Sequence, residues 1–209
     1  MKLIKGSRTI RRYIVNGELE GETLSLVQNA LRRFSFTNPV SNQSAEEKMG
    51  WVTTHSLLDT DFDLLENWYV NGYAFAQIRI DKKTLPSNLF RAKLEARIQD
   101  WLIENNREKI FKKTKDELKD ALTFEMMAQT LPKVKAAEFC WNIDKNYVIF
   151  LNTSGTMNQK FMDYFYQSFG LSLSPFTPLM FLEDEDPNIE KLTKAGRSSF
   201  RVIPVERGE

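Results

Sequence analysis

The alternation of polar and apolar positions along the chain predicts a set of β-strands. Residues Arg8–Val15 are rich in β-branched side chains and end at the Asn16-Gly17 turn. Within Tyr69–Asp81 the residues alternate as in a half-buried strand, and Asn71-Gly72 supplies a hairpin turn or a bulge. Asp144-Lys145-Asn146 has the composition of a tight hairpin turn. Further strands are predicted at 49–52, 137–143, 147–152, 178–182 and 200–205.

Apolar residues spaced three and four apart predict helices between these strands. Glu22–Phe34 has one such stripe, with arginines in its last turn. Met157–Phe169 is amphipathic, rich in aromatic residues, and ends at Gly170, where a left-handed cap is inexpensive. Both patterns are typical of helices that pack one face against a sheet.

Two more helices form a continuous polar segment with separate apolar stripes. The first begins at Leu85-Pro86, and its stripe comprises Leu94, Ile98, Trp101 and Leu102. For the second, Thr114 and Glu117 form a capping box that predicts its start, and Leu131-Pro132 predicts its end. This pattern indicates a protruding helical hairpin, or one long helix broken near Lys112.

Strands and helices are mixed without regular βαβ alternation. The fold class is therefore α+β, with a mostly antiparallel sheet, packed helices and a protruding basic helical arm. We predict that residues 1–85 and 133–209 form a central sheet domain. Residues 86–132 form the helical arm, or tip, inserted in it.

Composition describes an ordinary globular protein. The chain has 209 residues, is 42% hydrophobic and contains 15 Phe, and no apolar run approaches the roughly 20 residues of a membrane span. The basic N-terminus lacks the apolar segment of a secretory signal. A single cysteine, Cys140, excludes an intrachain disulfide and favours a reducing compartment. We therefore expect a cytoplasmic protein with no membrane partner.

Charge is distributed unevenly along a chain whose net charge is only +1. Lysines and arginines accumulate between Arg79 and Lys135, and part of the compensating charge is the acidic run Glu183–Asp186. A polarised surface on a neutral protein favours a polyanionic partner, of which nucleic acid is the commonest. The alternative is that the basic helices are simply solvated.

The residue types needed for catalysis are scarce. His55 is the only histidine, and Cys140 lies in a predicted strand between two aromatic residues, where a buried thiol is expected. Asp59, Asp61 and Asp63 resemble the start of a calcium loop, but Leu64 stands where glycine is required. We predict no catalytic residue, metal, cofactor or small-molecule substrate.

Two short motifs have weak functional interpretations. Asp116-Glu117-Leu118-Lys119 resembles the end of a metal-dependent nuclease motif, although capping and charge pairing on a helix also explain it. Ser154-Gly155-Thr156 precedes a predicted helix and could hold one phosphate at the helix N-terminus. It lacks the glycine spacing of a nucleotide-binding loop.

The order of several short motifs resembles the bacterial recombination-associated RdgC family. Each motif is unspecific alone, but together they span most of Lys2–Leu182. They are Lys48-Met49-Gly50-Trp51-Val52, Asn71-Gly72, Leu85-Pro86, Leu94-Glu95-Ala96-Arg97-Ile98, the segment from Lys112 to Asp120, Leu131-Pro132, Trp141-Asn142-Ile143-Asp144 and Phe169-Gly170 to Pro178-Leu179.

The resemblance implies a nucleoid-associated, non-enzymatic protein that binds double-stranded DNA with little sequence preference. Members of that family form a ring-shaped homodimer with a basic hole and restrain recombinase activity by occupying DNA. Phosphate contacts would then be made by the basic arm and its neighbours, without reading of base edges. The residues to which motif matching carries this role are Lys82, Lys83, Arg97, Lys112, Lys113, Lys115 and Lys119.

Two departures from the family pattern are visible. The family continues through a substantial C-terminal region beyond the position of Leu182, so the expected assembly here is a closed ring or an open clamp. The segment Lys133–Lys135 replaces an aromatic residue that in the family helps to join the arm tips.

Two other functions compete with DNA binding. One is a protein-interaction module on the same fold, using an aromatic face around Phe161, Tyr164, Phe165 and Tyr166. The other is a metal-dependent nuclease, which needs clustered carboxylates that the sequence does not display. A continuous basic surface, an exposed apolar patch and converging carboxylates, respectively, would distinguish the three.

Overall fold

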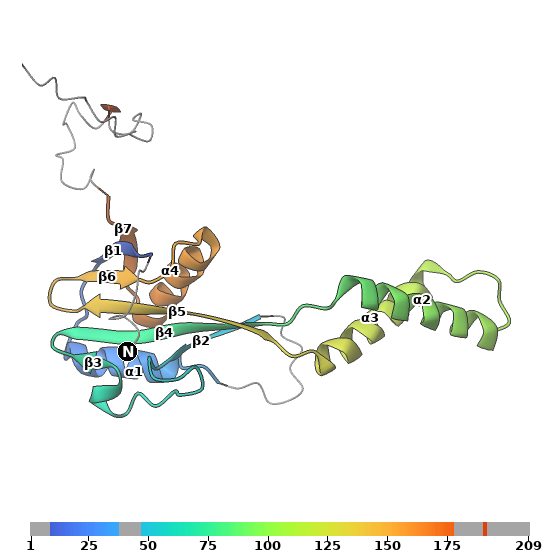
Figure 1. The fold of residues 1–209 in the computed structure, drawn as a ribbon, viewed down its shortest axis with the longest axis horizontal. Helices are drawn as coiled ribbons and strands as arrows, with labels where there is room; N and C mark the ends of the chain where they lie inside the picture. Colours follow the sequence, from blue (N-terminus) through green and yellow to red (C-terminus); the bar gives the residue numbers. More distant parts are fainter. Residues whose placement is uncertain (1–8, 38–46, 178–189, 192–209) are drawn as a thin grey trace, which may run out of the picture. The chain divides into compact units, whose positions relative to one another are not determined.

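The computed structural model describes residues 9–37, 47–177 and 190–191. The chain divides into two compact units, Met1–Ser174 and Pro175–Glu209, and the fold described below is that of the first. Its elements (Figure 1) are β1 (Arg11–Asn16), α1 (Thr23–Arg33), β2 (Glu47–Val52), η2 (Leu65–Asn67), β3 (Tyr69–Val70), β4 (Tyr73–Lys82), α2 (Ser87–Glu104), α3 (Lys112–Gln129), β5 (Lys133–Asn142), β6 (Tyr147–Phe150), α4 (Gly155–Phe169) and β7 (Ser172–Pro175).

One sheet organises this unit. Its strand order is β2-β4-β5-β6-β1-β7, and the short β3 pairs with β4. Pairing is antiparallel between β2 and β4, β4 and β5, β5 and β6, and β1 and β6. The long strands β4 and β5 are in register from Tyr73 opposite Asn142 to Lys82 opposite Lys133. The predicted α+β class with a mostly antiparallel sheet is confirmed.

The tight turns follow the sequence signals. Asn71 and Gly72 both have positive φ, +50° and +84°, between β3 and β4. This is the conformation that two-residue hairpin turns require, and Asn and Gly adopt it at the least cost. Asn146, with φ of +51°, closes the β5–β6 hairpin in the same region of backbone space. The hairpin predicted at Asp144-Lys145-Asn146 is confirmed, and of the two alternatives for Asn71-Gly72 the structure has the hairpin turn.

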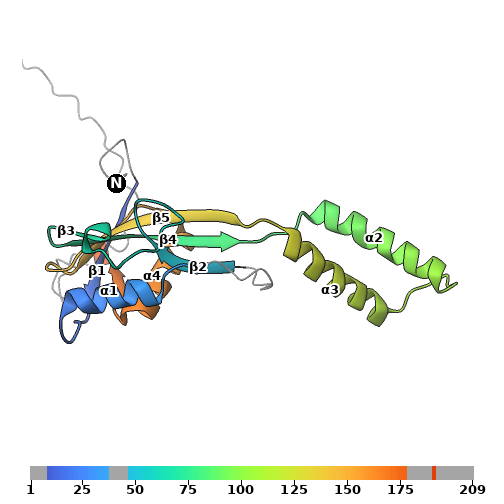
Figure 2. The ribbon, with the colours of Figure 1, turned by 90° about the horizontal axis from the view of Figure 1, so that it is seen from below.

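Helices α1 and α4 cover one face of the sheet (Figure 2). Phe161 and Phe165 of α4 are fully buried, and Phe161 stacks on Phe150 of β6 with ring centroids 4.0 Å apart. Burying each such ring stabilises the fold by about 1.5–3 kcal/mol. The aromatic face that the sequence offered as a docking surface is therefore the core. Of its four members only Tyr166 is exposed, because helical periodicity directs the other three at the sheet.

The helical arm is inserted between β4 and β5 and projects from the sheet (Figures 1 and 2). Helix α2 buries no residue, and its predicted stripe from Leu94 to Leu102 is only half-buried against α3. Helix α3 buries Leu122, Met126 and Met127 near its C-terminal end. The prediction that 86–132 forms a domain of its own stays a prediction.

Helix α3 begins earlier than its capping box predicted. The N-cap is Phe111, without a side-chain hydrogen bond, and the backbone N–H of Lys115 donates to the Phe111 carbonyl at 3.0 Å. Thr114 therefore lies inside the first turn, where its side chain cannot cap the helix. The predicted capping box at Thr114 and Glu117 is wrong.

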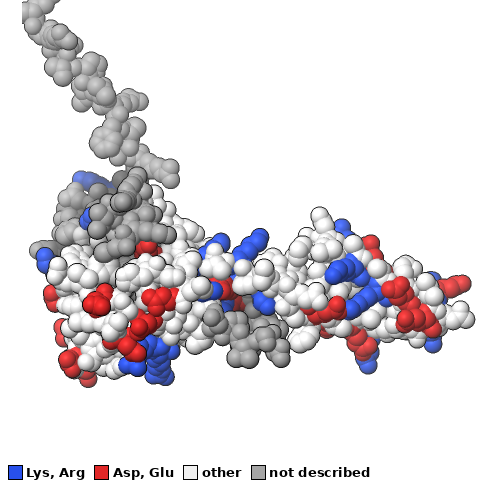
Figure 3. Space-filling model, turned by 60° about the horizontal axis from the view of Figure 1, so that its bottom comes forward, with Lys and Arg blue, Asp and Glu red and all other residues white. Residues whose placement is uncertain are grey.

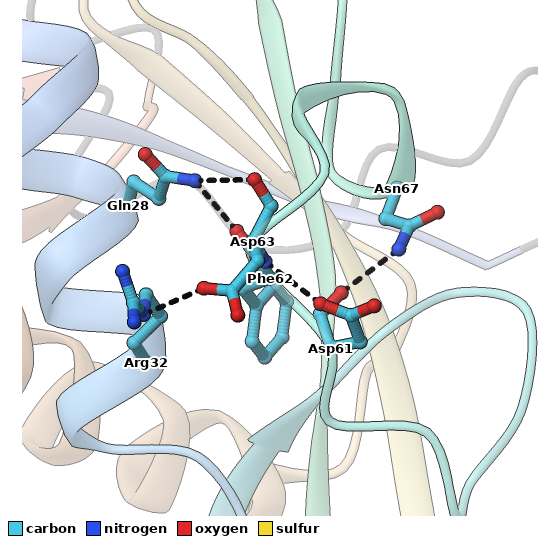
Figure 4. Close-up of polar contacts among 6 residues, drawn as sticks. All are labelled: Gln28, Arg32, Asp61, Phe62, Asp63 and Asn67. Carbon is cyan, nitrogen blue, oxygen red and sulfur yellow. Dashed lines mark hydrogen bonds and ion pairs between the residues drawn. The ribbon is translucent and has the colours of Figure 1, made fainter.

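The repeated aspartates between β2 and η2 stabilise a loop (Figure 4). The side chain of Asp59 accepts the backbone N–H of Asp61 at 3.0 Å, and the side chain of Asp61 accepts that of Asp63 at 2.9 Å. Asp63 also forms an ion pair with Arg32 of α1, at 2.9 Å. Successive Asx turns of this kind explain the spacing without a metal.

Gln28 of α1 fastens the same loop to the helix. Its side-chain amide donates to the backbone carbonyls of Phe62 and Asp63, at 2.8 and 2.9 Å (Figure 4). Asn67 holds the far side by donating to the carbonyl of Asp61 at 3.0 Å. These hydrogen bonds hold the loop from Thr53 to Trp68 in place beside the sheet.

Some expectations fall outside the described residues. The strands predicted at 178–182 and 200–205 lie there, as does the acidic run Glu183–Asp186. No helix in the described part of the chain is long and apolar enough to span a membrane.

Candidate nucleic-acid interface

Two lysines face each other at the point where the arm leaves the sheet. Lys82 ends β4, Lys133 begins β5, and the two residues are directly opposite in the antiparallel ladder. Both are exposed, and neither has a carboxylate partner among the described residues. Like charges directly opposite in a sheet destabilise it, so this pair is better accounted for by an anion that the protein binds than by folding.

The two lysines belong to a groove of about 550 Å³ on the face of the sheet that carries α4. Lys135 lies two residues after Lys133 and therefore projects on the same side of β5. The groove is lined by Glu47, Ile80, Lys82, Thr84, Lys133, Lys135, Ala136, Asn152, Ser154, Thr156, Met157 and Lys160.

The N-terminus of α4 opens into this groove. Ser154 is the N-cap residue but makes no side-chain capping bond, and the first turn of the helix has no acidic residue. The first backbone N–H groups of a helix have no intrahelical acceptor, and the helix dipole gives this end a partial positive charge. The Ser154-Gly155-Thr156 motif is weak evidence for a phosphate site by itself, but in the folded protein it shares the groove with Lys82, Lys133 and Lys135.

The one acid in the groove is already neutralised. Glu47 of β2 lies opposite Lys82, but it forms an ion pair with Lys160 of α4. Lys82, Lys133 and Lys135 therefore remain as uncompensated charges around a helix N-terminus. We call these three residues the neck lysines. Their geometry suits a phosphate, whose oxygens accept charged hydrogen bonds from several directions.

The arm itself is less basic than the sequence suggested. Figure 3 shows Lys and Arg side chains gathered where the sheet meets the arm, and acidic and basic side chains interleaved along the arm. Helices α2 and α3 include Glu95, Asp100, Asp116, Glu117 and Asp120 among their basic residues. The basic residues of the arm are therefore largely balanced by acids of the same helices.

Two predicted phosphate contacts have structural roles. Lys83 donates from Nζ to the backbone carbonyl of Met127 at 2.9 Å, near the C-terminus of α3. Cations are favourable at that end of a helix, so this bond secures the base of the arm. Arg97 of α2 forms an ion pair with Glu125 of α3. Its charge is largely used in holding the two helices together.

Lys112, Lys113, Lys115 and Lys119 lie in the first half of α3, at the distal end of the arm. Lys112, Lys113 and Lys115 occupy the first turn, where positive charges oppose the helix dipole. The 18 residues of α3 correspond to about 27 Å, so this group is separated from the neck lysines by roughly that distance. The predicted set is thus divided between two places.

A family model with the description "Putative exonuclease, RdgC" matches residues 8–189. The chain belongs to the RdgC family. A search of curated proteins finds no match. Membership supports a DNA-related role in recombination for this RdgC-family chain.

The described residues include possible metal ligands and the two candidate catalytic side chains, Cys140 and His55. No three His, Cys, Asp or Glu side chains there are placed to hold a metal ion. Burial raises the pKa of Cys140 to about 11, so its thiol stays protonated at neutral pH. His55 is exposed on the loop that follows β2.

Sequence reasoning missed Lys133, Lys135 and Lys160 as site residues. The sequence did contain a signal for Lys133. Lys82 and Lys133 flank the inserted arm, so they must be neighbours if β4 and β5 pair. Lys160 gave no local signal, because only the packing of α4 brings it to the groove.

Proposed function

We propose that this RdgC-family protein is a sequence-tolerant double-stranded DNA-binding protein that contacts phosphates through the neck lysines and the distal lysines of α3. The main support is the opposition of Lys82 and Lys133 in a groove that also contains Lys135 and the N-terminus of α4. Lysine is a flexible point charge and suits phosphate better than a base edge.

In this mechanism affinity comes from the release of counterions. Each lysine that neutralises a phosphate frees a condensed cation, so binding weakens steeply with salt. The neck and distal groups are about 27 Å apart, which corresponds to roughly eight nucleotides along one strand of B-DNA. The arm lies along the duplex, and no residue reads sequence.

We further propose that the protein acts by occupancy and not by catalysis. DNA covered along the arm is withheld from recombination and replication proteins, without any bond being made or broken. The protein would act in the bacterial cytoplasm, associated with the nucleoid.

A homodimer is part of the proposal. The arm exposes large apolar side chains that an isolated helical hairpin leaves in water: Ile103, Phe111, Phe124 and Leu131, which are 77%, 66%, 61% and 86% exposed. Contact with a second copy would remove such side chains from solvent, a gain of about 1.5–3 kcal/mol for each one fully buried. The same surface is what favours the competing function, a protein-interaction module.

The direct test is fluorescence anisotropy with a random-sequence duplex at several salt concentrations. Wild-type protein should bind in the micromolar range or tighter, and affinity should fall steeply with salt. Lys82→Ala/Lys133→Ala should lower the slope of log K against log salt by about 1.8. A matched control is Lys145→Ala, an exposed lysine in the β5–β6 turn at the other end of β5.

Two results would contradict the proposal. No binding at low salt would leave the interaction module as the better function. Degradation of an end-labelled duplex in the presence of Mg²⁺, by protein freed of contaminating nuclease, would establish catalysis instead. Light scattering across a dilution series tests the dimer separately.

A further inference from the structure

The face of the sheet opposite α1 and α4 contains a row of buried polar residues. Arg79 and Asp81 of β4 form a bidentate pair, with N–O distances of 2.8 and 2.6 Å. Arg79 also donates to the carbonyl of Leu57 at 2.8 Å, and its guanidinium lies 4.0 Å from the ring centroid of Phe36. The arginine and the aspartate are thereby satisfied by each other and by their surroundings.

Glu138 of β5 is on this same face and has no such partner. The residue is 8% exposed, and its Oε2 is closed off from solvent without a hydrogen bond among the described residues. The residue directly opposite is Gln77, whose amide nitrogen donates to the carbonyl of Thr53 at 3.0 Å. That bond uses the amide nitrogen, so the amide oxygen of Gln77 remains an acceptor, and Gln77 lines the same groove as Glu138.

Glu138 has no cation paired with it among the described residues. Arg79 is paired with Asp81, Lys48 lies opposite Asp81 in the β2–β4 ladder, and no ion pair reaches Glu138. An ionised carboxylate in a desolvated place is unfavourable unless a cation or hydrogen-bond donors accompany it. His55, exposed at the rim, forms no ion pair with it.

Glu138 also lines a groove of about 320 Å³. Its lining combines acceptors and hydroxyls with aliphatic walls: Thr54, His55, Ser56, Leu57, Gln77, Ala136, Ala137, Glu138 and Leu151. The wall formed by the loop is held in place, because Thr53 donates from Oγ1 to Asp59 at 2.6 Å and Arg79 holds the carbonyl of Leu57. The protein's own hydrogen bonds therefore shape the groove, and its volume is within the range of small-molecule sites.

We propose that this groove binds an ammonium or guanidinium group carried on an aliphatic stem, with Glu138 as the counter-ion. The carboxylate supplies the charge, the Gln77 amide oxygen supplies a second acceptor, and Leu57 and Leu151 contact the stem. A free polyamine and a lysine or arginine side chain of a protein share this chemistry. A neutral ligand would leave the Glu138 charge uncompensated.

This site is separate from the proposed DNA surface. Side chains alternate between the two faces of a strand, so Glu138 of β5 points away from the face on which Lys133 and Lys135 project. A ligand bound at Glu138 should therefore leave DNA affinity unchanged, and failure of one proposal is distinguishable from failure of the other.

The test is thermal unfolding of the full chain titrated with n-butylammonium at constant ionic strength, with n-butanol and potassium as controls. The ammonium probe should raise the unfolding temperature saturably, and the two controls should not. Glu138→Gln keeps the shape of the side chain and should weaken the probe by about tenfold to a hundredfold, as loss of a charge-assisted contact predicts. Glu104→Gln, an exposed acid on α2, is the matched control and should bind normally.

Further experiments identify the source of the cation and keep the test valid if a variant misfolds. Spermidine binding more tightly than Nα-acetyl-lysine amide would indicate a free polyamine, and the reverse a protein side chain. Leu57→Lys places an ammonium at the groove from within the chain and should abolish probe binding even if Glu138→Gln folds poorly. Equal effects of n-butylammonium and n-butanol, or an unchanged response in Glu138→Gln, would overturn the proposal.

Discussion

Lys82 and Lys133 are directly opposite each other across the β4–β5 ladder although the whole helical arm separates them in the sequence. Each flanks the arm, so the pairing of β4 with β5 places the two lysines side by side in the sheet. A fold selected for stability alone would place opposite charges there. The pair is therefore the clearest point at which stability and the proposed DNA binding conflict.

Reversing the charge of one lysine of the Lys82–Lys133 pair should change stability and DNA affinity in opposite directions. Lys133→Glu creates an opposite-charge pair with Lys82 and should raise the free energy of unfolding by about 0.2–1 kcal/mol. DNA affinity should fall by more than it does in Lys133→Ala. Urea denaturation and anisotropy on the same preparations check both, and a variant that is less stable than wild type would contradict the charge argument.

The distal lysines of α3 should contribute a second, independent part of the salt dependence. Lys112→Ala/Lys113→Ala/Lys115→Ala should lower the slope of log K against log salt by up to about 2.7 if all three contact phosphates. The variant should also be slightly more stable, because it removes cations from a helix N-terminus. An unchanged slope, measured beside Lys145→Ala, would restrict the interface to the neck lysines.

The two arginine ion pairs should differ greatly in their effect on stability. The Arg79–Asp81 pair is about 9% exposed on both sides, so Asp81→Ala leaves a buried guanidinium unpaired and should cost about 3–5 kcal/mol. Arg97 and Glu125 are 37% and 47% exposed, and Arg97→Ala should cost no more than about 1 kcal/mol. Urea denaturation distinguishes them; similar losses would mean that burial does not control these pairs.

Gly50 should not tolerate even one methyl group. A Cβ at this position would lie 2.3 Å from the backbone Cα of Phe36, because the chain at Phe34–Phe36 bonds to Trp51 beside β2. Gly50→Ala must displace backbone and should destabilise the protein by about 1–3 kcal/mol or more. Gly155→Ala, which meets no atom within 4 Å, is the control and should be neutral or stabilising by about 0.4–1 kcal/mol. Thermal unfolding compares the two.

Cys140 should be slow to react while the protein is folded. Burial raises the pKa of its thiol from 9.0 to about 11, so at pH 8 the thiolate fraction is about a hundredfold below that of a free thiol. Alkylation by iodoacetamide should be slowed by at least that factor and should accelerate in denaturant. Rapid labelling of the native protein would show that the thiol is accessible and activated.

Local signals were sufficient for most individual elements. Asn71-Gly72 and Asp144-Lys145-Asn146 predicted their turns because left-handed backbone is inexpensive only for a few residue types. Gly170, with φ of +71°, ended α4 for the same reason. The capping box at Thr114 did not predict where α3 begins, because the conformation of the preceding loop also decides the first helical residue. In the structure Phe111 is the N-cap.

The sequence by itself determined most of the elements, the α+β class and the insertion of an arm, since these depend on periodicity and turn chemistry within a few residues. Only the tertiary structure decided which charges are free. In the folded protein Lys83 donates a hydrogen bond to the Met127 carbonyl, and Arg97 forms an ion pair with Glu125. Lys82, Lys133 and Lys135 lie together in the groove at the N-terminus of α4. The physical reason is the distance in sequence between the segments that interact. Strand register and helix packing bring distant segments together to form a site, and neither leaves a pattern in neighbouring residues.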